Sequence, residues 1–433
     1  DAPQVWIGNS YANNGYNYAQ LQATAYDPTL RFSPDGNNQP GSGSCNPYPS
    51  SRTGCQMSVN FTQKDFELPS IWKANLAFDH ELPWYGVVAS AELIMTDVKN
   101  ALYYRRLNLG PGFTGPDGRS LYWNPTKRGA AYATSDNQYG RDTRFGDVYL
   151  IDNTSKGKSQ QFTASLTKPW SPGSDWSWTL GYTYTHATEV GPLTSSTASS
   201  GYTYQYSFNS GEDISQTSRY EIKDRISGSL NWKHKFFGDY DTSVGLVYEG
   251  RSGRPYSYVF VGDANGDSRT YNDLFYVPKG TGDVYFGKFN ANGTVAVDSA
   301  MEKRFYDWLA TKPELAAYKG SYAPANAFRT GFINTFDLRL SQQIPGFFKG
   351  NKAEVWVDIQ NVGNLLNKKW GNIYDYGFYA DASVASLVGI SRDGKYVYNF
   401  TGASSPTVAN SDADGFNVGV SQWSLQVGLR YEF

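Results

Sequence analysis

Residues 176–185 read Trp-Ser-Trp-Thr-Leu-Gly-Tyr-Thr-Tyr-Thr, with a large apolar or aromatic side chain at every second position. Ser, Thr and Gly occupy the positions between them. Because successive side chains of a β-strand point to opposite faces, this pattern predicts a strand with one apolar and one polar face. The last residues, 423–433, alternate in the same way and end on Phe433.

The same alternation recurs along the chain and predicts nine strands. They cover residues 72–79, 87–96, 161–166, 176–185, 225–233, 243–249, 336–341, 354–360 and 423–433. Aromatic residues make up 16% of the sequence, which also contains 44 glycines, while charged residues reach only 18%. Aromatic residues favour strands and glycine favours turns, so the composition also predicts an all-β protein.

The connections between these strands alternate between short and long. Short turns fall near residues 82–84, 169–174, 236–239 and 344–351, and long segments cover 107–157, 187–218, 251–328 and 366–420. Outer-membrane barrels have short periplasmic turns and long external loops, whereas structureless loops of this length are unusual in compact soluble domains. The pattern therefore predicts an antiparallel transmembrane β-barrel with long extracellular loops, whose apolar face contacts outer-membrane lipids.

Aromatic residues cluster at the strand ends beside the short turns, as expected for a girdle at a membrane interface. The pairs are Trp72 and Trp84, Trp170 and Trp176, Phe236 and Phe237, Phe347 and Phe348, and Tyr431 and Phe433. The alternative is that aromatic residues are simply good strand formers. The charged residues between the apolar positions fit a wet lumen, but they also fit the outer surface of a soluble sandwich.

Several classes of function find no support in the sequence. The formal net charge is −2, which argues against a nucleic-acid partner. No run of 18 apolar residues predicts a transmembrane helix. His80, His186 and His234 lack metal-ligand spacing, and no nucleophile or phosphate-binding motif stands in its proper context, so we expect no enzyme.

One loop carries the spacing of a calcium site. Asp263, Asn265 and Asp267 stand at relative positions 1, 3 and 5, and Asp273 lies one residue before position 12. Ser268 occupies the position of the usual loop glycine, so the alternative is a turn rich in Asp and Asn. We expect no required cofactor and treat calcium as the candidate ligand of this loop.

Two further local features carry predictions. Cys45 and Cys55 lie in a stretch rich in Gly, Ser and Pro, which predicts a disulfide within an external loop, with two free thiols as the alternative. Ser299 and Glu302 form a capping-box pattern, which predicts a short helix interrupted at Pro313.

Some motifs resemble those of a known family. The segment Asn-Thr-Phe-Asp-Leu-Arg-Leu-Ser-Gln-Gln-Ile-Pro at 334–345 is similar to a late strand of TonB-dependent receptors of the Oar-like group. So is Val-Asp-Ile-Gln-Asn-Val-Gly-Asn-Leu-Leu-Asn at 357–367, followed by Trp370-Gly371. The run 262–267 looks like that group's long external loop, and residues 422–433 resemble the closing strand of outer-membrane proteins.

This resemblance implies a transporter barrel of 22 strands with an N-terminal plug and a TonB box, placed in the outer membrane of a Gram-negative bacterium. On this basis we expect residues 1–65 to be mostly extracellular loop and residues 66–433 to be the C-terminal strands of the barrel. The plug is not found in this chain. The implied partners are the TonB complex, acting through the missing plug region, and the remainder of the barrel, supplied by the same protein or by a partner chain.

The leading hypothesis is therefore a TonB-dependent importer whose ligand the sequence does not identify. The alternatives are a passive porin, a surface adhesin on a similar barrel, and a secreted glycan-binding β protein. A bacterial single-chain barrel has an even number of strands and both chain ends in the periplasm. Nine strands that begin outside satisfy neither condition, so we expect either an incomplete barrel or a partner chain that completes it. The family resemblance implies about thirteen further strands, and the plug, before Asp1.

Overall fold

The computed structural model describes residues 58–433 except 144, 194, 196, 378–380 and 410–420. Strand is by far the main secondary structure of the described chain, with 48% of the residues against 8% in helices, which confirms the all-β class. The helices are short, and within the described residues none has the length and apolar character needed to cross a membrane. Cys45 and Cys55 lie outside the described residues, so their predicted disulfide stays a prediction.

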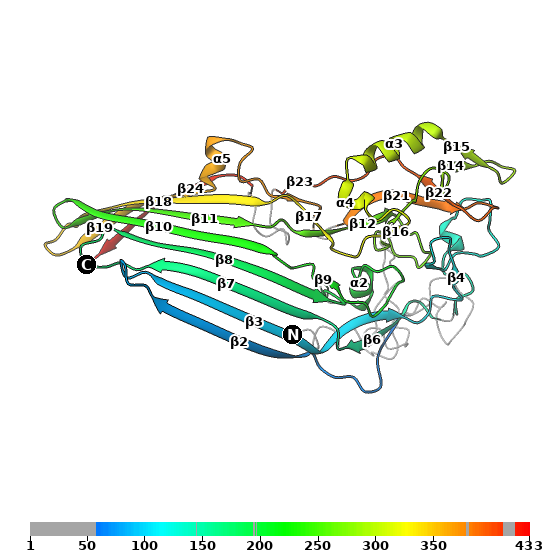
Figure 1. Cartoon of the computed structure of the whole chain (residues 1–433), viewed down its shortest axis with the longest axis horizontal. Helices are drawn as coiled ribbons and strands as arrows, with labels where there is room; N and C mark the ends of the chain where they lie inside the picture. The colour runs from blue at the N-terminus through cyan, green and yellow to red at the C-terminus, as the bar shows by residue number, and fades with distance from the viewer. Residues whose placement is uncertain (1–57, 144, 194, 196, 378–380, 410–420) are drawn as a thin grey trace, which may run out of the picture.

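Nine long antiparallel strands form the main sheet, and they correspond to the nine predicted segments (Figure 1). Each pairs with the next long strand in the chain, so the sheet is built from successive hairpins. In spatial order the strands are β2 (Ser70–Glu81), β3 (Val88–Arg106), β7 (Lys158–Lys168), β8 (Trp176–Glu189), β10 (Asp224–Phe237), β11 (Tyr240–Arg251), β18 (Ile333–Pro345), β19 (Lys352–Gln360) and β24 (Ser424–Glu432).

The register of the sheet gathers the apolar positions of all nine strands on one face. Leu180 of β8, for example, lies opposite Leu166 of β7 and Gly228 of β10. The side chains on this face are largely exposed, with Leu76 73% and Leu429 69% accessible. A continuous exposed apolar surface of this extent requires an apolar environment or a partner.

The opposite face carries charged side chains that pair across neighbouring strands. Arg225 lies 2.7 Å from Glu249, and Arg339 lies 3.2 Å from Asp358. The two faces of the sheet therefore have the apolar and polar character predicted from the alternation.

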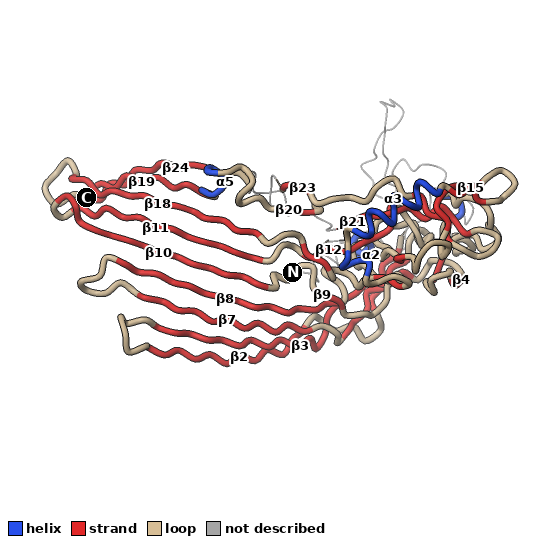
Figure 2. The backbone as a smooth tube through the Cα atoms, turned by 45° about the horizontal axis from the view of Figure 1, so that its top comes forward, coloured by secondary structure: helices blue, strands red, loops and turns tan. Residues whose placement is uncertain are grey.

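The short turns all lie at one end of the sheet and the long loops at the other, as Figure 2 shows. Trp84, Trp170, Phe237 and Phe347 are exposed at the short-turn end. The grouping of Trp72 with Trp84 was wrong, because Trp72 is the third residue of β2 and lies towards the long-loop end. Exposed aromatic residues therefore mark both ends of this hairpin.

The main sheet has two open edges. In the described part of the chain β2 pairs only with β3 and β24 only with β19, so the nine strands do not close on themselves. This agrees with the incomplete barrel expected from the odd strand count. Since unpaired backbone groups cannot be satisfied in lipid, a membrane-inserted form of this sheet needs further strands along both edges.

Three shorter strands extend the sheet at the long-loop end, and the shortest, β9 (Gln216–Thr217), pairs with the end of β8. β6 (Val148–Thr154) pairs with the upper half of β3, and β1 (Val59–Thr62) pairs with β6 in parallel. Of the segment 1–65 only residues 58–65 are described, and β1 lies within them. The extracellular assignment of that segment stays a prediction.

Residues 113–139, 252–332 and 381–408, from three of the long loops, pack together into a compact unit that we call the cap. Its sheet has the order β15 (Val295–Val297), β14 (Tyr285–Phe289), β22 (Tyr396–Asn399), β21 (Asp381–Ile390), β12 (Pro255–Val261) and β17 (Phe328–Arg329). Phe260, Phe286, Phe305 and Tyr398 pack at its centre with almost no exposure. The long loops are therefore folded around an aromatic core of their own.

The predicted helix is present in the cap as α3 (Ser299–Ala310), followed by α4 (Pro313–Ala316). Its N-cap is Asp298 rather than Ser299, since the Asp298 carboxylate accepts a 2.8 Å hydrogen bond from the Met301 amide. Phe305 and Leu309 are buried against the cap sheet.

The remaining elements are short. Those within the residue ranges of the cap are β4 (Phe113–Thr114), β5 (Ser120–Leu121), the 3-10 helix Thr134–Asp136, β13 (Tyr276–Val277), β16 (Ser321–Tyr322) and β23 (Thr407–Val408), and those outside it are α2 (Ala198–Thr203), α5 (Val362–Leu366) and β20 (Tyr374–Asp375).

Candidate functional site at the cap and its junction with the sheet

The predicted calcium residues lie in one closed loop of the cap, residues 262–274, which we call the Asp-rich loop. The loop leaves β12 and returns beside it, since the Phe260 amide donates to the Asp273 carbonyl at 2.9 Å. Its side-chain oxygens accept hydrogen bonds from its own backbone. The Asp263 carboxylate accepts from the amides of Gly266 and Ser268 at 2.7 and 2.8 Å, and Asn265 Oδ1 accepts from the Asp267 amide at 2.8 Å.

Two residues from another long loop hold the Asp-rich loop in place. Asp267 accepts hydrogen bonds from the Tyr202 hydroxyl at 2.9 Å and the Ser210 hydroxyl at 2.8 Å. Asn265 Nδ2 donates to the same Ser210 oxygen at 2.6 Å. Asp273 in turn accepts from the Ala264 and Asn265 amides. All four predicted residues are therefore brought together, as a hydrogen-bonded network of Asx turns.

The carboxylates of this loop are buried close to one another. Burial is the main cause that raises the pKa of Asp263 well above its usual range, and repulsion from Asp267 and Asp273 adds to it. Burial, followed by repulsion from Asp267, raises the pKa of Asp273 to about 7, although Arg119 and two backbone hydrogen bonds oppose this shift. The loop thus concentrates negative charge in a poorly solvated place.

Arg119 is a buried cation that faces this cluster, and no sequence motif indicated its role. Its Nη1 lies 4.0 Å from Asp273 Oδ1, while its other nitrogens donate to Asp117 and to the Leu274 carbonyl, both at 2.7 Å. The guanidinium is buried between aromatic rings, 5.0 Å from each ring centre. Within the described residues, no three Asp, Glu, His or Cys side chains are arranged as ligands of one metal ion.

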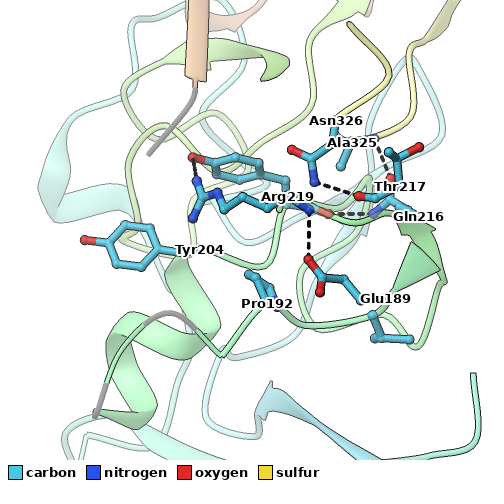
Figure 3. A pocket seen from close by; sticks show the side chains of 10 residues that line it. Glu189, Pro192, Tyr204, Gln216, Thr217, Arg219, Ala325 and Asn326 are labelled. Atoms are coloured by element: carbon cyan, nitrogen blue, oxygen red, sulfur yellow. Dashed lines mark hydrogen bonds between the residues drawn. The ribbon is translucent and has the colours of Figure 1, made fainter. Parts of the chain in front are cut away.

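A second feature lies where the cap meets the long-loop end of the sheet, centred on the buried Arg219 (Figure 3). The Arg219 amide donates to Glu189 at 2.9 Å and its guanidinium donates to the Tyr206 hydroxyl at 3.1 Å. Asn326 Nδ2 donates to the Thr217 carbonyl at 2.9 Å from the cap side. The cavity between these side chains measures only about 10 Å³, so it has room for no more than a water molecule.

Arg219 also lines a larger cavity beside the first, which we call the mouth pocket. Its volume is about 240 Å³. Its walls come from the segments that precede β10 and follow β11, from the start of β18, and from β20 and its neighbours. They are Arg219, Tyr220, Glu221, Ile222, Arg251, Ser252, Arg254, Pro255, Ile333, Ile373, Tyr374, Asp375 and Ala409.

The mouth pocket was not predicted from the sequence, because its walls come from four separate segments and no motif connects them. The three histidines do not contribute to either cavity. His186 lies 3.3 Å from Glu221, and His234 lies 2.7 Å from Asp175 at the short-turn end. They stay apart from one another, as their positions in separate strands indicate.

Comparisons with known proteins give little further guidance. No family model matches the sequence, and no curated protein matches it. Among solved structures, the chain is similar to the outer membrane transporter YddB from Escherichia coli, with 13% identity and a TM-score of 0.38. The match covers 87% of this chain and 34% of that chain, so the present chain spans about a third of that transporter's length. A similarity of this size assigns no family.

Proposed function

We propose that this chain is part of a transmembrane barrel in the outer membrane of a Gram-negative bacterium, and that the barrel imports a ligand. The observation that carries the proposal is the exposed apolar face that runs without interruption across all nine antiparallel strands. Its opposite face is charged and its strands are 9 to 19 residues long, enough to cross a bilayer. The weak similarity to an outer membrane transporter is compatible with this proposal, but the proposal does not depend on it.

We further propose that the barrel imports its ligand and that this import depends on TonB. Both proposals rest on the resemblance of segments 334–345 and 357–367 to TonB-dependent receptors of the Oar-like group. A polar inner face suits a lumen that a plug domain fills, and a folded cap suits a ligand-capturing surface outside the cell. The partners of this chain are then outer-membrane lipids, further strands along β2 and β24, and the TonB complex acting through a plug.

Membrane insertion is tested by fractionation of cells that express the full-length protein. We expect the protein in the outer-membrane fraction, resistant to carbonate extraction, and migrating faster in gels before boiling than after it. A secreted glycan-binding protein would instead remain soluble without detergent, and that result would remove the proposal.

TonB dependence is tested with the periplasmic domain of TonB. The full-length protein should retain that domain on a column, and loss of the plug should abolish retention. A passive porin would conduct ions steadily in a planar bilayer and would ignore TonB, whereas a plugged importer should conduct little.

A second proposal concerns the Asp-rich loop, which we propose binds calcium through Asp263, Asn265, Asp267 and Asp273. The residues supply only hard oxygen donors, and a divalent cation would relieve the repulsion among the buried carboxylates. The oxygens would have to exchange backbone hydrogen bonds for the ion, so magnesium, with its stricter geometry, should bind less well. Calorimetric titration with calcium chloride tests this, and Asp267→Asn should weaken binding if the proposal holds.

A further inference from the structure

We propose that a rigid turn after β19 binds the negatively charged, phosphate-bearing headgroup of a lipid in the outer leaflet. The turn comprises residues 362–372, which we call the interface turn, and it begins with α5. The inference rests on the proposed function, because it requires the barrel to be inserted in a bilayer. It adds a specific lipid contact to the general one that the apolar strand face provides.

The length of β19 places the interface turn at the outer boundary of the membrane. β19 and its neighbour β24 have nine residues each, and β19 begins directly after the short turn at 346–351. At ~3.3 Å per residue and a strand tilt of ~40°, nine residues cross about 23 Å of an apolar band that is about 25 Å tall. The strand therefore ends, at Gln360, where the outer headgroups begin.

Both ends of the interface turn lie beside the start of β24. Gln360, just before the turn, is paired with Ser424. Just after the turn, the Ile373 amide donates to the Ser421 hydroxyl at 3.0 Å. Trp423 stands between these two contacts, is 44% exposed, and is in step with the apolar-face residues of β24. Because Trp is typical of the membrane–water interface, its position agrees with the depth derived from β19.

Hydrogen bonds within the interface turn fix its shape. Asn364 Nδ2 donates to the carbonyls of Lys368 and Trp370 at 3.2 and 2.9 Å, and Asn361 Nδ2 donates to the Gly371 carbonyl at 3.1 Å. Both asparagines are buried. Gly371 has a φ of +65°, and a Cβ there would overlap the Asn361 side chain. Buried amides and a glycine thus hold the turn, so its large side chains remain available to a partner.

The exposed side chains of the interface turn combine apolar and cationic groups. Leu366 is 75% exposed and Trp370 is 56% exposed, and Leu365 is exposed beside them. Lys368 and Lys369 lie between Leu366 and Trp370 and are also exposed. Figure 1 shows α5 standing out from the main sheet, where a bilayer surface can reach it. Apolar and aromatic groups enter the boundary between headgroups and acyl chains, while lysines bind anionic headgroups.

A lipid suits the interface turn better than a protein or a second copy of this chain. The exposed part of the turn has only six residues, 365–370, whereas a stable protein interface uses about 20–30 residues on each side. A lipid headgroup needs far less surface. A lysine can lay its aliphatic stem along the apolar side chains and place its ammonium group at the phosphate.

The proposal is tested by native mass spectrometry of the full-length protein in detergent. The probes are phosphatidylglycerol, whose headgroup is negatively charged, and phosphatidylcholine, whose headgroup has no net charge. Phosphatidylglycerol should bind roughly 25-fold more tightly, since each lysine near an anionic lipid contributes about fivefold. Equal affinities for the two lipids would overturn the proposal, and so would a lysine-dependent dimer of the protein in place of bound lipid.

Variants locate the site. Lys368→Gln combined with Lys369→Gln should weaken phosphatidylglycerol binding roughly 25-fold and leave phosphatidylcholine binding unchanged. Lys303→Gln combined with Lys319→Gln is the matched control, because it removes the same charge from exposed positions of the cap, and it should leave both affinities unchanged. Leu366→Asn should weaken both lipids by a similar factor. Equal losses of phosphatidylglycerol binding in the two double variants would refute the assignment to the interface turn.

Outer-membrane fractionation of the same proteins separates this inference from the proposed function. Faster migration in gels before boiling than after it shows that each variant has folded. A protein that inserts in the outer membrane but binds both lipids equally refutes only this inference. A protein that does not insert refutes the proposed function, and the inference falls with it.

Discussion

Replacing Leu180 by arginine should destabilise the inserted protein by about 2–4 kcal/mol, the cost of a cationic side chain on the lipid face near the bilayer midplane. Leu180 is on the apolar face and is 51% exposed. It follows Trp176, the aromatic residue at the short-turn end of β8, by four positions. At ~3.3 Å per residue and a strand tilt of ~40°, this places Leu180 roughly 10 Å into an apolar band about 25 Å tall.

Thr179→Arg is the control, because the adjacent side chain points to the polar face. Thr179 loses a 3.3 Å hydrogen bond to Thr167, which contributes about 0.5–1.5 kcal/mol, but its replacement arginine stays hydrated. The two variants thus compare the two faces at nearly the same depth.

Urea unfolding of the full-length protein in lipid vesicles measures both free energies. The predicted cost for Leu180→Arg corresponds to a decrease of roughly 30- to 700-fold in the ratio of folded to unfolded protein. If the apolar face contacted water instead of lipid, Leu180→Arg would be a surface change within about 0.5 kcal/mol. Equal costs at the two positions would refute the assignment of the faces.

Four further predictions concern the cap, the cysteines and the polar face. Because the pKa of Asp273 is raised, the folded cap binds more protons than the unfolded chain between about pH 4 and 7. Without calcium, the free energy of unfolding of the cap should therefore fall as pH rises through that window. Asp273→Asn should flatten this pH dependence, measured by fluorescence. Removal of calcium with a chelator should lower the melting temperature of the cap, and readdition should restore it, whereas an unchanged melting curve would count against the calcium proposal. Protein purified without reductant should show no alkylatable thiol at Cys45 or Cys55 after denaturation. Gly428→Ala should cost about 1–3 kcal/mol in urea unfolding, because a Cβ there would overlap the Trp356 indole, and Trp356→Leu should remove most of that cost.

The nine long strands could be predicted because the property that defines them, a side-chain period of two, is written locally in the sequence. The ends of these strands were harder to predict. The predicted strand 87–96 continues to Arg106 in β3, since its upper half pairs with β6 in place of β7, and this change of partner leaves no simple pattern. Trp72 was grouped with the wrong strand end because an aromatic residue near a strand terminus does not reveal which terminus it marks.

The cap could not be predicted from local patterns. β12, residues Pro255–Val261, is almost continuously buried, so its sequence shows no alternation, and its longer pairing, with β21, joins it to another loop. The Asp-rich loop was recognisable from Asp263 and Asp267, but its contacts to Ser210 and Arg119 join residues far apart in the chain. The oxygen ligands of the loop could therefore be recognised in the sequence, but the residues that contact them could not.

The pairing of β12 with β21 has a consequence for the order in which the chain can assemble. Every long strand of the main sheet pairs with a neighbour in the chain, but the cap sheet joins residues 257–261 to residues 381–386, with β18 and β19 lying between them in sequence. Closing a loop costs entropy before its contacts form, so such distant pairing is expected to be slow and late. A chain interrupted before residue 381 could still form its earlier hairpins, but the aromatic side chains of β12 and α3 would lack the packing partners that β21 and β22 supply. The cap is thus completed only after the seventh and eighth long strands have been made, so a folded cap marks chains that extend beyond residue 386.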